Sequence, residues 1–246
     1  MTHSAMWKKY MVRFLCRILT LAVAVLLYVL RPESFAVVQG LNFFRRFSLL
    51  HILWVIWMID MISQLLPARK YIALGSLKYM ARYHQPAQTP EPSVKRAFVN
   101  SSDRGALKVL VVWVLLTLVI GALHVFQILN ASILLLISVF FYLCDLICVL
   151  FWCPFRVFLM KNRCCTTCRI FNWDHFMMFS ILVFVPGFYT LSLFFMSIVV
   201  LLVWEITFHT HPERFWDRTN RSLRCASCTD RLCAHTACIR KPKQMQ

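Results

Sequence analysis

The sequence is poor in acidic residues and in glycine. It has 10 Asp and Glu against 27 Lys and Arg, and only five glycines among 246 residues. So few glycines leave no glycine-rich loop for a phosphate, and the patterns H-E-x-x-H and G-x-S-x-G are also absent. We therefore assign no catalytic residue. The sequence favours a protein that is not an enzyme over one that is.

A signal-peptidase site is also missing near the N-terminus. Lys8, Lys9 and Arg13 precede an apolar run, as they would in a secretory signal. The run is followed by Arg31-Pro32-Glu33 rather than by a small-x-small motif. We expect this segment to remain attached to the chain as a signal-anchor helix.

Long apolar runs dominate what is present. The chain is 60% hydrophobic, with a mean hydropathy of +0.65. A soluble domain is nearer half apolar, so the excess is expected in lipid. About 20 apolar residues cross a hydrocarbon core of roughly 30 Å. Candidate spans are 14–30, 48–66, two helices within 106–153 that turn near Asn130-Ala131-Ser132, and the final stretch 170–209.

The final stretch has two interpretations. Its 40 residues are long for one span and short for two. Pro186-Gly187 offers a turn near the middle, which would leave two arms of about 17 residues. The competing interpretation is one long helix that is kinked and tilted.

The basic residues favour two crossings. In that case 24 of the 27 Lys and Arg lie on the side of both termini, and only Arg31, Arg45 and Arg46 lie on the other. A single final crossing would place the eight basic residues of the tail outside. Because basic residues concentrate in cytoplasmic loops, we predict six transmembrane helices in the cell (cytoplasmic) membrane, with both termini cytoplasmic.

The predicted fold class is therefore all-α and polytopic. We divide the chain into four parts. These are an N-terminal transmembrane hairpin (1–66), a basic interfacial segment with a Pro-rich linker (67–105), transmembrane helices three to six with a cytoplasmic cysteine loop at 154–174 (106–209), and a basic, cysteine-rich cytoplasmic tail (210–246).

Seven of the 11 cysteines lie in two short polar segments, and each segment contains a C-x-x-C pair. Two such pairs that meet in space form a four-thiolate cage, the usual ligand set of a structural zinc ion. The predicted ligands are Cys165, Cys168, Cys225 and Cys228. With six helices, both pairs emerge on the cytoplasmic face at the two ends of one helical hairpin.

Other ligand sets remain open. Cys164 can replace Cys165, and the tail alone can supply Cys225 and Cys228 together with Cys233 or His235 and Cys238. Nearby Arg163, Arg169, Arg221 and Arg224 are expected to lower the thiol pKa values and so favour the thiolates that metals require. The same thiolates could hold an iron–sulfur cluster, act as reactive dithiols or stay free.

Among the acidic side chains within the predicted spans, we single out Asp60, Asp145 and Glu205. A charge at mid-span costs on the order of 3 kcal/mol on insertion scales, so Asp145 should face the bundle and have a partner, or be protonated. It serves either as a proton or cation relay, as an extra metal ligand, or as a polar packing contact. Asp60 is expected near the cytoplasmic interface, within reach of Arg69, and Glu205 with His209 has the i, i+4 spacing of metal ligands or of interfacial caps.

The expected function is a non-enzymatic scaffold, assembly or regulatory protein with a zinc site on its cytoplasmic face. One alternative is a membrane redox protein, and another is a small transporter or channel that uses Asp145. The net charge of +17 fits topology and anionic lipid headgroups, with a possible protein partner at the basic tail. Nucleic acid is not expected as a partner.

The predicted sidedness can be tested with reporter fusions. A reporter that is active only in the cytoplasm should be active after Gln246 and inactive when inserted in the loop at 31–47, because that loop is the predicted external segment. Alkaline phosphatase, which is active only outside, should give the reverse pattern. Phosphatase activity at the C-terminus would instead support a single final crossing.

Overall fold

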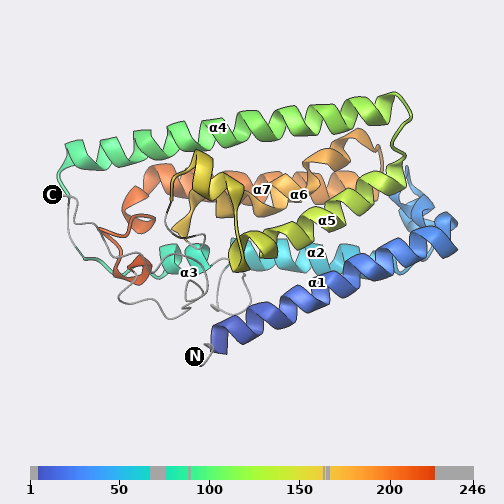
Figure 1. Ribbon diagram of the computed structural model, residues 1–246, viewed down its shortest axis with the longest axis horizontal. Coiled ribbons are helices and arrows are strands. Elements are labelled where there is room, and N and C mark those ends of the chain that lie inside the picture. Colours follow the sequence, from blue (N-terminus) through green and yellow to red (C-terminus); the bar gives the residue numbers. More distant parts are fainter. Residues whose placement is uncertain (1–4, 67–75, 88–89, 163, 165–166, 225–246) are drawn as a thin grey trace.

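The computed structural model describes residues 5–66, 76–87, 90–162, 164 and 167–224. Within these ranges the protein is all-α, with helices arranged side by side in an elongated bundle (Figure 1). The long helices are α1 (Ala5–Leu30), α2 (Leu50–Leu65), α4 (Pro92–Val125), α5 (Ala131–Leu150) and α7 (Phe188–Thr210). Two short α-helices, α3 (Ser76–Arg82) and α6 (Asp174–Phe179), lie between them.

Shorter turns of helix connect these elements. The 3-10 helices are η1 (Pro32–Val38), η2 (Asn42–Phe44), η5 (Arg169–Trp173), η6 (Ser180–Phe184), η7 (Pro212–Arg214) and η8 (Arg221–Leu223). A π-helix, η3 (Phe155–Leu159), follows α5. Each of these pieces is short, as expected for helical forms with poorer hydrogen-bond geometry than the α-helix.

Four of the described helices are long and apolar enough to cross a membrane by length and composition: α1, α4, α5 and α7. The α2 helix is apolar but has only 16 residues. These four helices are consistent with a membrane protein. The α5 helix begins where the sequence places a turn, because the side chain of Asn130 accepts a hydrogen bond from the Ile133 amide at 2.9 Å and caps the helix.

The stretch 170–209 folds as a hairpin. Its first arm is not the continuous α-helix expected from the sequence, because η5 and η6 are 3-10 helices on either side of the six residues of α6. The arm then turns at Pro186-Gly187, and α7 packs back against α6. A Cβ atom at Gly187 would lie 2.2 Å from the Val38 carbonyl oxygen, so only glycine allows this turn to approach the loop between α1 and α2.

The α4 helix extends well beyond its apolar part. It begins at Pro92, a position where proline is tolerated because the first helical amide needs no partner. Its 34 residues give a length of about 51 Å. The helix therefore runs across residue 105, where the sequence divides the basic segment 67–105 from the transmembrane part.

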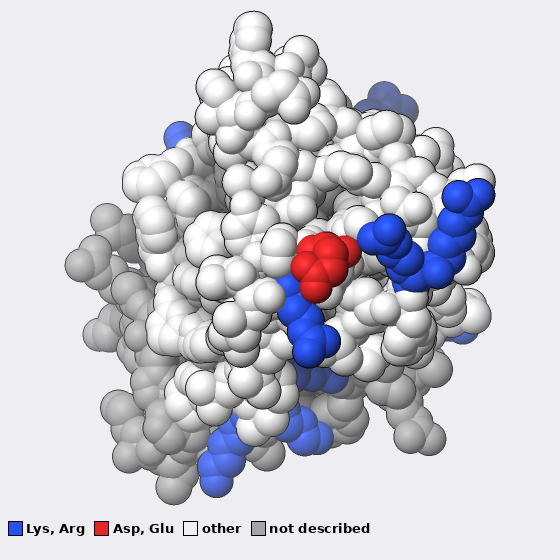
Figure 2. Space-filling model, turned by 90° about the vertical axis from the view of Figure 1, so that its right-hand side faces the viewer, with Lys and Arg blue, Asp and Glu red and all other residues white. Residues whose placement is uncertain are grey.

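The bundle has two different ends. One, here called the Gly40 end, contains the α1–α2 loop, where Gly40 exchanges backbone hydrogen bonds with Pro186 and Phe188 at 2.9 and 3.0 Å. Figure 2 shows this end, on which charged side chains are few. The opposite end, here called the α3 end, contains α3, the start of α4 and the close of α7 (Figure 1).

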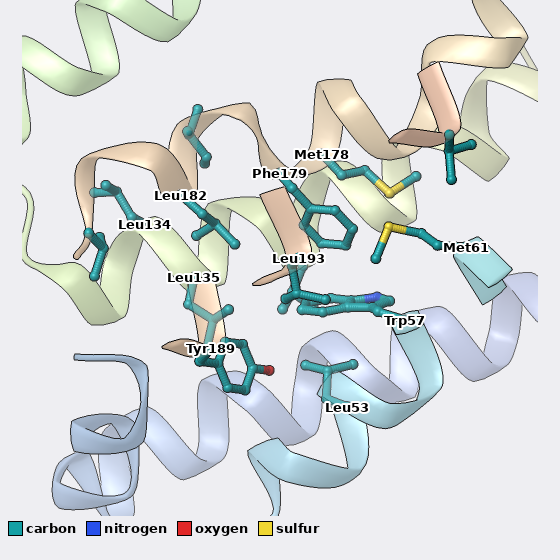
Figure 3. Close-up of a cluster of buried hydrophobic side chains, with 14 of the residues drawn as sticks. Leu53, Trp57, Met61, Leu134, Leu135, Met178, Phe179, Leu182, Tyr189 and Leu193 are labelled. Atoms are coloured by element: carbon teal, nitrogen blue, oxygen red, sulfur yellow. The ribbon is translucent and has the colours of Figure 1, made fainter. Parts of the chain in front are cut away.

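Buried aromatic and aliphatic side chains hold the helices together. Trp57 of α2 is fully buried, and its ring centroid lies 5.0 Å from that of Phe179 and 5.8 Å from that of Tyr142. Met61 and Met178 extend toward each other beside the Trp57 ring (Figure 3). Edge-to-face ring pairs of this kind contribute about 0.5–1.5 kcal/mol beyond the area that they bury.

Replacing Trp57 with alanine should leave a large cavity at the centre of this cluster. We expect Trp57→Ala to lower the free energy of unfolding by about 3–5 kcal/mol, measured by denaturation in detergent micelles. Trp152→Ala is the matched control, since the Trp152 side chain is 52% exposed. Equal losses in the two variants would contradict a core centred on Trp57.

Candidate functional site: charged clusters in the apolar bundle

Three charged clusters, each with a buried basic residue, lie in the bundle, and each contains one of the acidic residues singled out in the sequence. The first joins α1 to α5. Asp145 lies 2.8 Å from Arg17, whose guanidinium group also lies 3.7 Å from the centre of the Tyr142 ring and donates to the Tyr142 carbonyl. Arg17 is only 3% exposed, so this cation is held by a carboxylate and an aromatic face rather than by water.

The second cluster joins α2, α3 and α6. Lys78 of α3 is fully buried, and its ammonium group donates to Gln64 and to Asp174, which lies 3.2 Å away. Gln64 also donates to the second oxygen of Asp174 at 3.0 Å. We call the set Asp60, Gln64, Lys78, Asp174 and His175 the Lys78 cluster.

His175 completes the Lys78 cluster. Its Nδ1 lies 3.2 Å from Asp174 and its Nε2 lies 3.2 Å from Asp60. With a protonated His175, the cluster contains two positive and two negative charges and is neutral. Asp60 thus contacts a histidine of the final hairpin, while Arg69, its expected neighbour, lies outside the described residues.

The third cluster is centred on Arg169 and joins α4, η5 and α7. Arg169 pairs with Asp103 and with Glu205, and its Nη2 lies 3.2 Å from the Nε2 of His209. Trp173 donates to Glu205 at 2.7 Å. Glu205 and His209 therefore share one helix face, as their spacing predicts, but an arginine side chain lies between them.

Most of the cysteines that the sequence predicts as cage ligands lie outside the described residues. Cys165, Cys225, Cys228, Cys233, His235 and Cys238 are not among the described residues. Cys164 is half-buried, and Cys168 is only 4% exposed, in an apolar cluster with Val109, Ile170 and Trp173. Within the described ranges, no three His, Cys, Asp or Glu side chains form a group able to hold a metal ion.

The expected effect of the arginines on the thiols is wrong for Cys168. Burial raises the pKa of the Cys168 thiol to about 12, so this thiol is protonated near neutral pH. The neighbouring Arg169 does not oppose this effect, because its guanidinium group is directed to Asp103 and Glu205. To act as a zinc ligand, the Cys168 thiol would have to lose this proton.

Sequence reasoning missed most partners in these clusters. Lys78 lies in a basic segment in which a lysine is usually solvated, and Asp174 and His175 follow a short polar loop. The one usable signal was that Asp60 and Gln64 are four residues apart on an apolar helix, so one face of α2 is polar. The finding that each acidic residue has a cationic partner supports a role for these clusters in fixing the helices.

Removing one partner of the Lys78 cluster should be costly. Lys78→Met removes one of the two cations that contact Asp174 and leaves the buried cluster with an excess negative charge, so we expect a loss of about 3–5 kcal/mol in the free energy of unfolding. Lys95→Met is the control, because Lys95 pairs with Glu213 at the surface, where both side chains are at least 31% exposed. That variant should lose less than about 1 kcal/mol.

A second variant separates charge from packing. Adding Asp174→Asn to Lys78→Met removes the excess negative charge and should recover part of the lost stability. Chemical denaturation of the purified proteins in detergent micelles measures both effects. The interpretation fails when Lys78→Met is no more destabilising than Lys95→Met.

The described clusters thus form ion pairs between helices that are far apart in sequence. Each ion pair fixes the relative position of two elements, which apolar contacts alone would not specify. Comparison of the chain with protein-family models, with curated proteins and with solved structures finds no match in any of the three.

Proposed function

We propose that the chain is a multi-pass protein of the cell membrane whose cytoplasmic cysteines bind zinc, and that it serves as a non-enzymatic scaffold, assembly or regulatory protein. In this proposal the α3 end faces the cytoplasm and the bundle crosses the bilayer six times. The first arm of the final hairpin supports six crossings, because the 16 residues of η5, α6 and η6 would reach about 29 Å if in line.

One observation carries the zinc proposal. The α3 helix, only seven residues long, contacts both η5 and η8. The η5 helix begins directly after Cys168, and η8 ends at Leu223, two residues before Cys225. The helices that flank the two cysteine segments therefore both contact one short element, and this supports a tetrahedral site built by the two segments together.

The tail is fixed in this position by buried hydrogen bonds. Asn220 is fully buried and donates to the carbonyls of Met80 and Arg214 at 2.9 and 2.8 Å. The backbone amide of Gln85 donates a hydrogen bond to the Asn220 Oδ1 at 3.3 Å. On the α4 side, the Phe98 and Trp216 rings stack with centroids 4.8 Å apart. The tail up to Arg224 thus packs on α3 and α4 before the second cysteine segment begins.

A non-enzymatic role is supported by the way in which the buried charges are used. Asp145, the candidate for a transport relay, forms an ion pair with Arg17, and Glu205 pairs with Arg169. Groups committed to such pairs fix helix positions, whereas a relay needs a group that can exchange its proton. A rigid bundle with a basic cytoplasmic face suits a protein that positions a partner.

The zinc proposal is tested by metal analysis of the purified full-length protein. We expect at least one equivalent of zinc and no visible absorption. Cys225→Ser/Cys228→Ser should remove the metal, since both the four-cysteine cage and a tail-only site require these thiolates. Bound iron with a brown colour would instead support the iron–sulfur alternative.

Two further variants complete the test. Cys16→Ser/Cys144→Ser removes two thiols from α1 and α5 and should leave the metal content unchanged. Cys165→Ser/Cys168→Ser separates the ligand sets, because it abolishes the cage between the two segments and spares a site confined to the tail. Full metal content in Cys225→Ser/Cys228→Ser would overturn both sets.

A further inference from the structure

An open basic pocket lies on α4 near the α3 end. It has a volume of about 490 Å³ and is formed by the first half of α4 and the segment 159–161, which begins at the last residue of η3. Its polar lining consists of Asn100, Ser101, Arg104, Lys108 and Lys161, and no lining residue is acidic. Three cations, an amide and a hydroxyl group thus face one cavity of ligand size.

The three cations of this pocket differ from the buried basic residues that hold the helices together. Arg17, Lys78 and Arg169 are buried against carboxylates, as described above. By contrast, the exposed side chains of Arg104, Lys108 and Lys161 make no ion pair or hydrogen bond with any part of the chain that the structure describes. Their positive charge remains available to an anion.

The backbone that presents Lys161 is unusual. Lys161 has a φ of +49°, in the left-handed region that residues other than glycine rarely adopt. Such conformations are strained and persist where the surroundings or a ligand favour them. Here the turn places Lys161 in the same pocket as Arg104 and Lys108. Beside them, the Met160 side chain packs closely against Gly105 of α4.

The depth of the pocket matches the headgroup level of a bilayer. From Val109 to Val125 the α4 helix contains 17 residues and extends about 26 Å, close to the thickness of the hydrocarbon core. Lys108 directly precedes this segment, and Arg104 lies one turn before Lys108. In the membrane orientation proposed above, they lie where lipid phosphates lie, on the cytoplasmic side.

An exposed apolar stripe continues from the basic residues. Val111, Leu115 and Leu118 follow Arg104 and Lys108 at intervals of three and four residues, so all five share one face of α4. The three apolar side chains are 51%, 58% and 56% exposed. One helix face thus presents cations at the headgroup level and an apolar surface along the acyl chains.

We propose that this pocket binds the phosphate of an anionic phospholipid, with the acyl chains lying along the apolar stripe of α4. Arg104, Lys108 and Lys161 contact the phosphate oxygens, and Asn100 and Ser101 donate further hydrogen bonds. A zwitterionic headgroup is disfavoured because its quaternary amine would lie among three cations. The proposal rests on the membrane placement proposed above and not on the zinc site.

The test uses purified full-length protein in non-ionic detergent with equal amounts of phosphatidylglycerol and phosphatidylcholine. Native mass spectrometry counts the lipids that stay bound. We expect the wild type to retain phosphatidylglycerol with a preference of about tenfold or more, since each cation near a membrane surface strengthens binding severalfold. Arg104→Gln/Lys108→Gln/Lys161→Gln should lose this preference.

The matched control removes three exposed cations from outside the pocket. Lys8→Gln/Arg82→Gln/Arg96→Gln changes the net charge equally and should keep the preference. Equal loss in the control variant would overturn the site in favour of diffuse surface charge. Release of the lipid by millimolar inorganic phosphate would overturn a lipid as the occupant and identify a site for free phosphate.

Two measurements keep the outcomes separable. Thermal unfolding of each variant in detergent shows whether it is folded, and Arg104→Gln alone serves as a milder variant with a smaller loss of preference. Zinc content should be the same in the wild type and in the pocket variants. A protein that binds zinc but shows no lipid preference would refute this inference and leave the metal proposal intact.

Discussion

Burying the ammonium group of Lys78 costs several kcal/mol unless a carboxylate and further acceptors lie against it. Asp174 and Gln64 supply these contacts, and they come from two different helices of the bundle. The position of α3 is therefore fixed relative to both α2 and α6. Because η5, η7 and η8 all contact α3, the geometry of the whole α3 end depends on this ion pair.

Basic residues serve two separate purposes in this fold. Arg17, Lys78 and Arg169 are almost completely buried and paired, so their charge is neutralised within the bundle. Arg104, Lys108 and Lys161 are exposed around a pocket that has no acidic lining. A basic residue of this apolar sequence thus joins two helices inside the bundle when a distant carboxylate faces it, whereas the three pocket cations stay exposed with no carboxylate in the lining. The net charge alone does not distinguish these cases.

Much of the helix layout follows from local sequence, whereas the charged clusters do not. Apolar length and the turns at Asn130 and at Pro186-Gly187 are local signals, and the structure has helix boundaries at both places. Arg17 and Asp145 are 128 positions apart, and Lys78 and Asp174 are 96 apart. Such pairs depend on which helices become neighbours, and a hydropathy pattern does not contain that information. The environment of Cys168 was missed for the same reason, because the α4 residues that bury it are some 60 positions away.

The position of α3 also connects the proposed metal site to stability. A ligand that binds only the folded state stabilises it by mass action, and the effect grows with the ligand concentration relative to its Kd. Zinc held between the segments that adjoin η5 and η8 would bind only when both helices lie against α3. The Lys78 cluster holds α3 in that place, so the metal and the ion pair favour the same arrangement. Weakening either one would then weaken the other, although no residue of the cluster would be a metal ligand.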